Sequence, residues 1–143
     1  TVNLNPDLPS IEAAPREIEQ VLVNLMLNAL DAMPTGGELT VETKLSGPDA
    51  VTSHAGERPE GFIAISVADN GVGIPESLQP MLFQPFFTTK PPGKGVGLGL
   101  ATAYGIVRQH HGSIEVQSQP GAGTRFTIYL PVRSTSASAG KAA

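Results

Sequence analysis

The side chain with the clearest chemical potential is Asp69, a lone carboxylate at the end of a mostly apolar run that begins at Phe62. The residues after it, 70–74, include Gly71 and Gly73. A carboxylate accepts directional hydrogen bonds, and a glycine without a side chain lets a flat ligand approach the main chain. Asp-Asn-Gly is also an ordinary turn sequence, so this stretch alone leaves a plain turn and a binding loop both open.

A second group of polar side chains falls on a predicted helix from Arg16 to Met33. Its apolar residues recur at three- and four-residue spacings, so one face belongs to the core, and Val23 and Leu27 widen that face. A step of about 100° per residue places four polar residues within one stripe of roughly 60°: Glu17, Asn24, Asn28 and Asp31. Asparagine is a poor helix former, so two of them at i and i+4 require an explanation. Amides bonded to each other or to water explain them as well as a binding role does.

A third candidate is the glycine-rich run Gly95-Val96-Gly97-Leu98-Gly99, which enters a helix predicted from Leu98 to His110. Free backbone amides at the start of a helix form a phosphate site. Three of the five phenylalanines stand just upstream, between Phe83 and Phe87, among prolines and glycines. This combination predicts a flexible lid with an apolar anchor. Simple packing of the loop onto the core would explain the phenylalanines but not the glycines.

The elements that must position these groups are mostly strands. Alternating apolar residues predict strands over 38–45, 62–67, 113–119 and 124–130, and the turn-forming glycines between the last two predict a terminal hairpin. We also expect two short strands within 1–14, a helix starting at Pro15, a helical turn at 75–78, and a long loop at 46–61.

The composition excludes several classes of protein. A net charge of -4 gives no electrostatic footprint for nucleic acid or an anionic membrane. Cysteine is absent, so disulfides and thiolate metal sites are excluded, and no apolar run approaches the roughly 20 residues of a membrane span. With 143 residues we expect one domain over 1–132, followed by a flexible tail or linker at 133–143. The start at Thr1 without methionine indicates a fragment of a longer protein.

Four segments in this order resemble the catalytic and ATP-binding domain of bacterial sensor histidine kinases, within the superfamily that includes DNA gyrase, Hsp90 and MutL. They are Asn24 to Ala29, Asp69 to Ile74, Phe86 to Leu100, and Gly121 to Thr124. The stretch from Pro85 to Lys90 is similar to the branch typified by nitrogen-regulatory sensors. The resemblance implies an α/β sandwich, the Bergerat ATP-binding fold, with a mixed five-stranded sheet, helices packed on one face and a flexible ATP lid.

The resemblance also implies a role for each group. Asp69 would accept a hydrogen bond from the adenine amine, and Gly71, Gly73 and Ile74 would lie against the base and sugar. Asn28 would bind a Mg²⁺ ion that bridges the phosphates. The remaining implied contacts to ATP come from the lid, the start of the following helix and the last hairpin: Lys90, Gly95, Val96, Gly97, Leu98, Gly99 and Thr124.

Asn24 favours a kinase over a hydrolase. In the ATP-hydrolysing relatives a glutamate at this position activates water, and an amide cannot take a proton at neutral pH. A kinase of this family transfers the γ-phosphate to a histidine on a separate dimerisation domain, and a response regulator acts downstream. His54, His110 and His111 fall on the wrong elements to be that acceptor. We therefore expect a monomeric fragment that binds Mg-ATP with little activity by itself, in the cytoplasm, either free or as part of a membrane-bound sensor.

Two alternatives share the nucleotide fold. The first is a serine kinase of the anti-sigma-factor type, against which the long lid with Phe86 and Phe87 argues. The second is an ATP-hydrolysing clamp such as a MutL or gyrase fragment, against which Asn24 argues.

Overall fold

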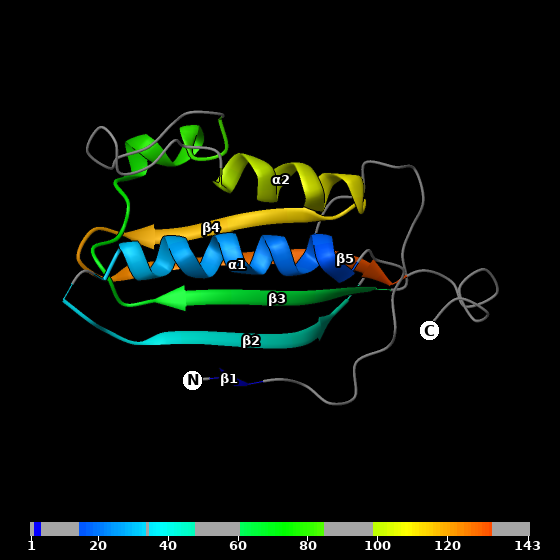
Figure 1. Ribbon diagram of the computed structural model, residues 1–143, viewed down its shortest axis with the longest axis horizontal. Helices are drawn as coiled ribbons and strands as arrows, with labels where there is room; N and C mark the ends of the chain where they lie inside the picture. Colours follow the sequence, from blue (N-terminus) through cyan, green and yellow to red (C-terminus); the bar gives the residue numbers. More distant parts are fainter. Residues whose placement is uncertain (1, 4–14, 34, 48–60, 85–98, 133–143) are drawn as a thin grey trace.

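The computed structural model describes residues 2–3, 15–33, 35–47, 61–84 and 99–132. These residues form two layers, a twisted sheet and a layer of helices on one of its faces (Figure 1). The elements follow the chain in this order: β1 (Val2–Asn3), α1 (Pro15–Asp31), β2 (Leu39–Ser46), β3 (Gly61–Asp69), the 3-10 helix η1 (Glu76–Met81), α2 (Gly99–Gln109), β4 (Ser113–Gln119) and β5 (Gly123–Val132). The fold is the predicted α/β class, and the lid lies outside the described residues.

The sheet has the strand order β1-β2-β3-β5-β4. Its four long strands are antiparallel neighbours, whereas the two residues of β1 pair with β2 in parallel. The predicted terminal hairpin, β4 with β5, is confirmed, and β2 and β3 also pair as antiparallel neighbours. The predicted strand over 62–67 extends to Asp69, so the carboxylate belongs to the last residue of β3. Of the two strands expected within 1–14, the described residues include only β1.

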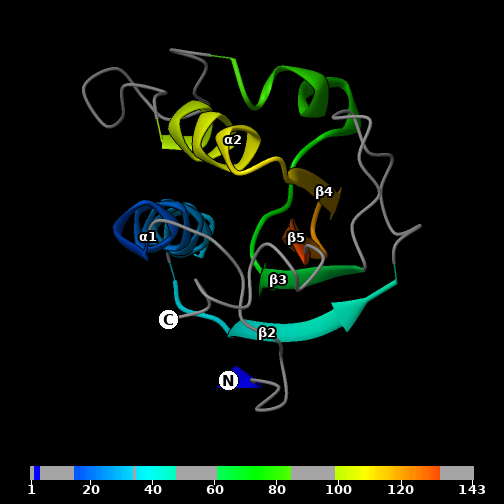
Figure 2. The same ribbon diagram turned by 90° about the vertical axis from the view of Figure 1, so that its right-hand side faces the viewer.

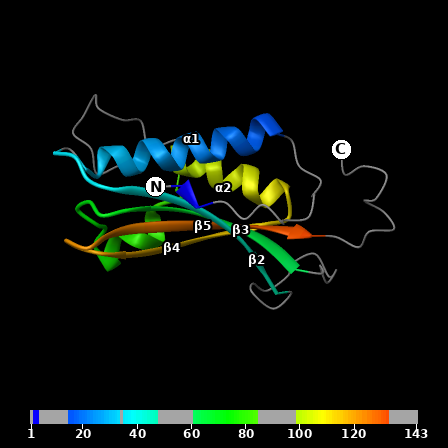
Figure 3. The ribbon, with the colours of Figure 1, turned by 90° about the horizontal axis from the view of Figure 1, so that it is seen from below.

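Helix α1 begins at Pro15, as predicted, because the fixed φ of proline suits the first helical position, and Glu17 stands in its first turn. Val21, Leu25 and Ala29 face the core at four-residue intervals. Helix α2 lies beside α1 on the same face of the sheet (Figures 2 and 3). None of the described helices combines the length and the apolar composition that a membrane crossing requires.

The prediction that Val23 and Leu27 widen the core face of α1 is wrong. Val23 is 44% exposed, and Leu27 and Leu30 are each 54% exposed. The sheet and α2 cover only one side of α1, so the residues on its opposite side face solvent. The predicted polar stripe lies at the border of the buried side, where Glu17, Asn24 and Asn28 are half-buried and Asp31 is exposed.

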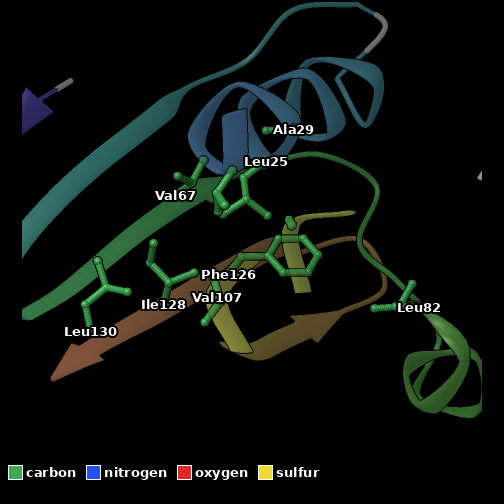
Figure 4. Close-up of a cluster of buried hydrophobic side chains, with 10 residues drawn as sticks. Leu25, Ala29, Val67, Leu82, Val107, Phe126, Ile128 and Leu130 are labelled. Carbon is green, nitrogen blue, oxygen red and sulfur yellow. The ribbon is translucent and has the colours of Figure 1, made fainter. Parts of the chain in front are cut away.

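The core fills the space between the sheet and the helices (Figure 4). Its largest fully buried side chains come from both layers: Phe126, Leu25, Ile128, Leu130, Val21, Val67 and Val107. Phe83 joins this core from the loop after η1, with its ring 6.3 Å from that of Phe126 and stacked 5.3 Å from that of Tyr104. Packing onto the core therefore accounts for Phe83, whereas Phe86 and Phe87 lie outside the described residues.

Candidate functional site

One row of paired residues crosses the sheet at the end where β3 finishes. Leu39 pairs with Asp69, Asp69 with Thr124, and Thr124 with Ser118. Directly paired residues point to the same face of a sheet, and Thr124 shares its face with the core residue Phe126 two positions on. The row therefore places a carboxylate beside two hydroxyls on the helix-covered face.

Asp69 uses one carboxylate oxygen to form its own turn. The Gly71 N–H donates a 2.8 Å hydrogen bond to Asp69 Oδ1, and the Asp69 residue is half-buried. Oδ2 makes no hydrogen bond with the residues that the structure describes. The ordinary Asp-Asn-Gly turn is thus present, and it leaves the second oxygen able to accept a hydrogen bond from a ligand.

The glycines after Asp69 are required by contacts with protein backbone. A Cβ on Gly71 would overlap the carbonyl of Ala32 at the end of α1, and one on Gly73, whose φ is +76°, would overlap the carbonyl of Gln119. Between them, the Val72 N–H donates to Ala32 O at 3.0 Å, and the Val72 carbonyl accepts from Gly121 at 2.8 Å. The loop is therefore held between α1 and the β4–β5 turn, a reason for glycine that the sequence did not reveal.

A hydroxyl network supports the other end of the row. Thr124 is only 4% exposed, and its Oγ1 lies 2.8 Å from Ser118 Oγ. Ser118 Oγ also accepts a 2.7 Å hydrogen bond from the Ile74 N–H and donates at 2.9 Å to the Gly123 carbonyl. Gln79 Nε2 donates to the carbonyls of Ile74 and Ser118 at 3.1 and 3.2 Å. This network fixes the loop after β3 against the β4–β5 hairpin.

Sequence reasoning identified Thr124 and Ile74 but missed Ser118 and Gln79. The hairpin register could have found Ser118, because a tight turn between Gln119 and Gly123 pairs Ser118 with Thr124. Gln79 carries no such signal, since it reaches the network from η1, an element that does not pair with the sheet.

The two helix asparagines have different surroundings. Asn24 Oδ1 accepts a 2.9 Å hydrogen bond from Gln20, and Asn24 Nδ2 donates at 3.0 Å to the carbonyl of Gly99, the first residue of α2. Asn28 is half-buried, and its side chain makes no hydrogen bond within the described residues. The side chains of Asn24 and Asn28 are therefore not hydrogen-bonded to each other, and the amide oxygen of Asn28 remains available.

The remaining predicted contacts fall in the segment before α2. Lys90, Gly95, Val96, Gly97 and Leu98 lie outside the described residues. Gly99, the last residue of that glycine-rich run, is exposed at the N-terminal end of α2. The structure thus brings together Asp69, Gly71, Gly73, Ile74 and Thr124 around one sheet end, and it joins Asn24 to Gly99 across the two helices.

The opposite face of the sheet, which none of the described helices covers, carries a separate hollow of about 530 Å³. Arg125 lies in it, 3.2 Å from Glu42 Oε1 and 3.0 Å from Ser66 Oγ. Because successive side chains of a strand alternate between faces, this hollow is separated from Asp69 and Thr124 by the sheet itself.

These features define an α/β domain with a cluster of polar side chains at one end of its sheet. Residues 13–134 match the family model described as histidine kinase-, DNA gyrase B-, and HSP90-like ATPase, and the chain belongs to this family.

Its relatives include sensor kinases. The chain is 46% identical over 127 residues to the sensor kinase CckA of Brucella abortus (strain 2308). This match covers 87% of the chain and 13% of CckA. It is also 45% identical over 130 residues to the sensory histidine kinase/phosphatase NtrB of Salmonella typhimurium. This second match covers 90% of the chain and 36% of NtrB. The chain therefore spans about one third or less of the length of these relatives.

The fold is also that of a known catalytic domain. The catalytic domain of histidine kinase ThkA superposes with a TM-score of 0.71 at 29% identity, and the match covers 93% of this chain and 79% of that one. The resemblance predicted from the four sequence segments is confirmed by these matches, and a nitrogen-regulatory sensor, NtrB, is among the relatives.

Proposed function

We propose that this domain binds Mg-ATP and forms the catalytic part of a sensor histidine kinase in two-component signal transduction. The observation that supports this most directly is the arrangement of Asp69, which holds its own turn with Oδ1 and keeps Oδ2 available beside Thr124. An acceptor pair at this point suits the amine of adenine and disfavours guanine, which offers a carbonyl there. Gly71, Gly73 and Ile74 then form the wall against the base and sugar.

The phosphates would extend from this end toward the helices. Mg²⁺, when bound, neutralises phosphate charge, and Asn28 offers it an amide oxygen of the hard type that it prefers. The amides of Gly97, Leu98 and Gly99 would hold phosphate at the start of α2, with Gly95 and Val96 in the lid and Lys90 as a countercharge there.

The chemical step is phosphoryl transfer to another protein group. The bond between the γ-phosphorus and the β–γ bridging oxygen breaks, a phosphorus–nitrogen bond forms to a histidine imidazole, and ADP leaves with the bonding electrons. That histidine would belong to a dimerisation and phosphotransfer domain elsewhere in the protein, and a response regulator would then receive the phosphoryl group. We propose that the isolated domain is monomeric, acts in the cytoplasm, and contacts neither nucleic acid nor membrane.

Asn24 supports transfer over hydrolysis, because both polar atoms of its amide are engaged and neither can accept a proton. Sustained Mg-ATP hydrolysis by the purified domain would contradict this part of the proposal.

Calorimetric titration of the domain with ATP and GTP tests the adenine site. Asp69→Ala should weaken ATP binding about 10- to 150-fold, the equivalent of a lost charged hydrogen bond of about 1.5–3 kcal/mol. Asp69→Asn is the matched control, because its amide oxygen can still accept from the Gly71 N–H while its NH₂ group opposes the adenine amine. It should keep the melting temperature close to wild type and still lose ATP affinity. Wild-type affinity in both variants would place the base elsewhere.

A further inference from the structure

Outside the residues to which the family resemblance assigns a role, Ser118 has the most connected side chain at this end of the sheet. Its Oγ lies within 3 Å of three polar groups: the Ile74 N–H at 2.7 Å, the Thr124 hydroxyl at 2.8 Å and the Gly123 carbonyl at 2.9 Å. A serine hydroxyl has one hydrogen to donate and two lone pairs to accept with. The three contacts therefore use its full capacity.

This capacity decides the direction of each hydrogen bond. The Ile74 N–H can only donate, and the Gly123 carbonyl can only accept, so Ser118 accepts from the first and donates to the second. The remaining lone pair of Ser118 faces Thr124 Oγ1. A hydrogen bond forms there only if Thr124 donates its hydrogen to Ser118. Thr124 is 4% exposed, and an unpaired buried hydroxyl is costly, so the network favours this single arrangement.

This arrangement determines what Thr124 on β5 and its partner Asp69 on β3 can offer a ligand. With its hydrogen committed to Ser118, Thr124 Oγ1 can offer only lone pairs to a ligand. Asp69, its direct partner on β3, also offers only an acceptor. Two neighbouring acceptors with no donor between them complement a group that brings hydrogens, such as an exocyclic amine or a water that bridges to it.

We propose that Ser118 is a positioning residue that strengthens the site's preference for adenine, by fixing the Thr124 hydroxyl as an acceptor. This proposal rests on the proposed function. Without Ser118, the Thr124 hydroxyl could rotate and donate to a carbonyl, so guanine would be rejected less strongly. Ser118 would act on base selection through Thr124 and would not itself touch the nucleotide.

The test is the ratio of GTP to ATP dissociation constants, measured by calorimetry or by competition against a fluorescent ATP analogue. Ser118→Ala should lower this ratio about five- to tenfold, the effect of one neutral hydrogen bond. The decisive step is a double-mutant cycle with Thr124→Val, which removes the hydroxyl at nearly constant shape. In the Thr124→Val background, Ser118→Ala should no longer change the ratio.

Two further variants serve as a control and as a substitute for the alanine variant. Ser66→Ala removes a buried hydroxyl from the opposite face of the sheet and should leave the ratio unchanged. Ser118→Cys keeps the side-chain volume with a poor hydrogen-bonding group, and it carries the same expectation as Ser118→Ala if the alanine variant does not fold.

The outcomes separate this inference from the proposed function. If wild type binds ATP and the ratio is unchanged in the Ser118 variants, Ser118 is only structural and the inference is wrong. The inference is also wrong if the effect of Ser118→Ala persists in the Thr124→Val background. If wild type binds no ATP, or if Asp69→Ala has no effect, the proposed function itself fails.

Discussion

The side-chain amide of Asn24 joins the two helices that cover the sheet, because its Nδ2 donates a 3.0 Å hydrogen bond to the carbonyl of Gly99. The other end of the same amide accepts from Gln20 Nε2 at 2.9 Å. Only a group that both donates and accepts can make these two bonds. A carboxylate at this position would turn an acceptor toward the Gly99 carbonyl, so the contact itself favours an amide over a carboxylate.

We expect Asn24→Asp to weaken both the fold and nucleotide binding. The substitution keeps the shape of the side chain but replaces the donor to Gly99 with an acceptor, which should cost about 0.5–1.5 kcal/mol of unfolding free energy because the bond is exposed to solvent. Because Gly99 begins α2, Mg-ATP affinity should fall as well. Denaturant unfolding and calorimetry measure the two effects.

The matched control for Asn24 is Gln20→Ala, which removes the exposed partner and leaves the bond to Gly99 in place. Its unfolding free energy should change by less than about 0.5 kcal/mol. If Asn24→Asp and Gln20→Ala lower the unfolding free energy equally, the hydrogen bond to Gly99 contributes no more than the one to Gln20.

Asn28→Ala should weaken ATP binding mainly when magnesium is present. The amide oxygen of Asn28 is not used by the described residues, and as a metal ligand it would contribute only to the metal-bound complex. Titrations with ATP in magnesium buffer and in EDTA measure the difference. The same fractional loss in both buffers would exclude the ligand role.

Leu25 and Leu27 offer a direct comparison of the two sides of α1. Leu25 is fully buried and Leu27 is 54% exposed, on the same helix and two residues apart. Leu25→Ala should lower the unfolding free energy by about 2–5 kcal/mol, because it leaves a cavity between α1 and the sheet. Leu27→Ala should change it by less than about 0.5 kcal/mol. Urea unfolding compares them, and similar losses would contradict the one-sided packing of α1.

Tyr129, on the helix-free face of the sheet, should make stability fall at high pH. Burial raises the pKa of Tyr129 above its ordinary value of about 10, and the nearby charge of Glu115 and a hydrogen bond with it raise the pKa further. Below about pH 10 the tyrosine is protonated in both states, so its contribution is constant. Above that pH the unfolded chain loses the proton first, so stability decreases until the folded tyrosine also titrates.

Unfolding measured between pH 9 and 11 should show this decrease in wild type and a smaller one in Tyr129→Phe. Parallel curves for the two proteins would show that another group causes the loss.

Much of the fold could be predicted because its signals are local. Proline at position 15 and the four-residue spacing of Val21, Leu25 and Ala29 are properties of the chain before it folds, and they define α1 and its buried face. The alternation in 113–119 and 124–130 likewise defines a hairpin and its register. The order of the four characteristic segments was sufficient to indicate the family.

The tertiary structure decided which of those local features meet. Asn24 and Gly99 are 75 residues apart in sequence, and Ile74 and Ser118 are 44 apart, so no local pattern relates either pair. The sequence determined that α1 has an apolar face, but only the packing of the sheet and α2 against one side left Leu27 and Leu30 exposed. Periodicity follows from the geometry of a single helix or strand, whereas contacts depend on how separate elements pack. That is why Gln79, and the hydrogen bond between Ile74 and Ser118, emerge only from the folded domain.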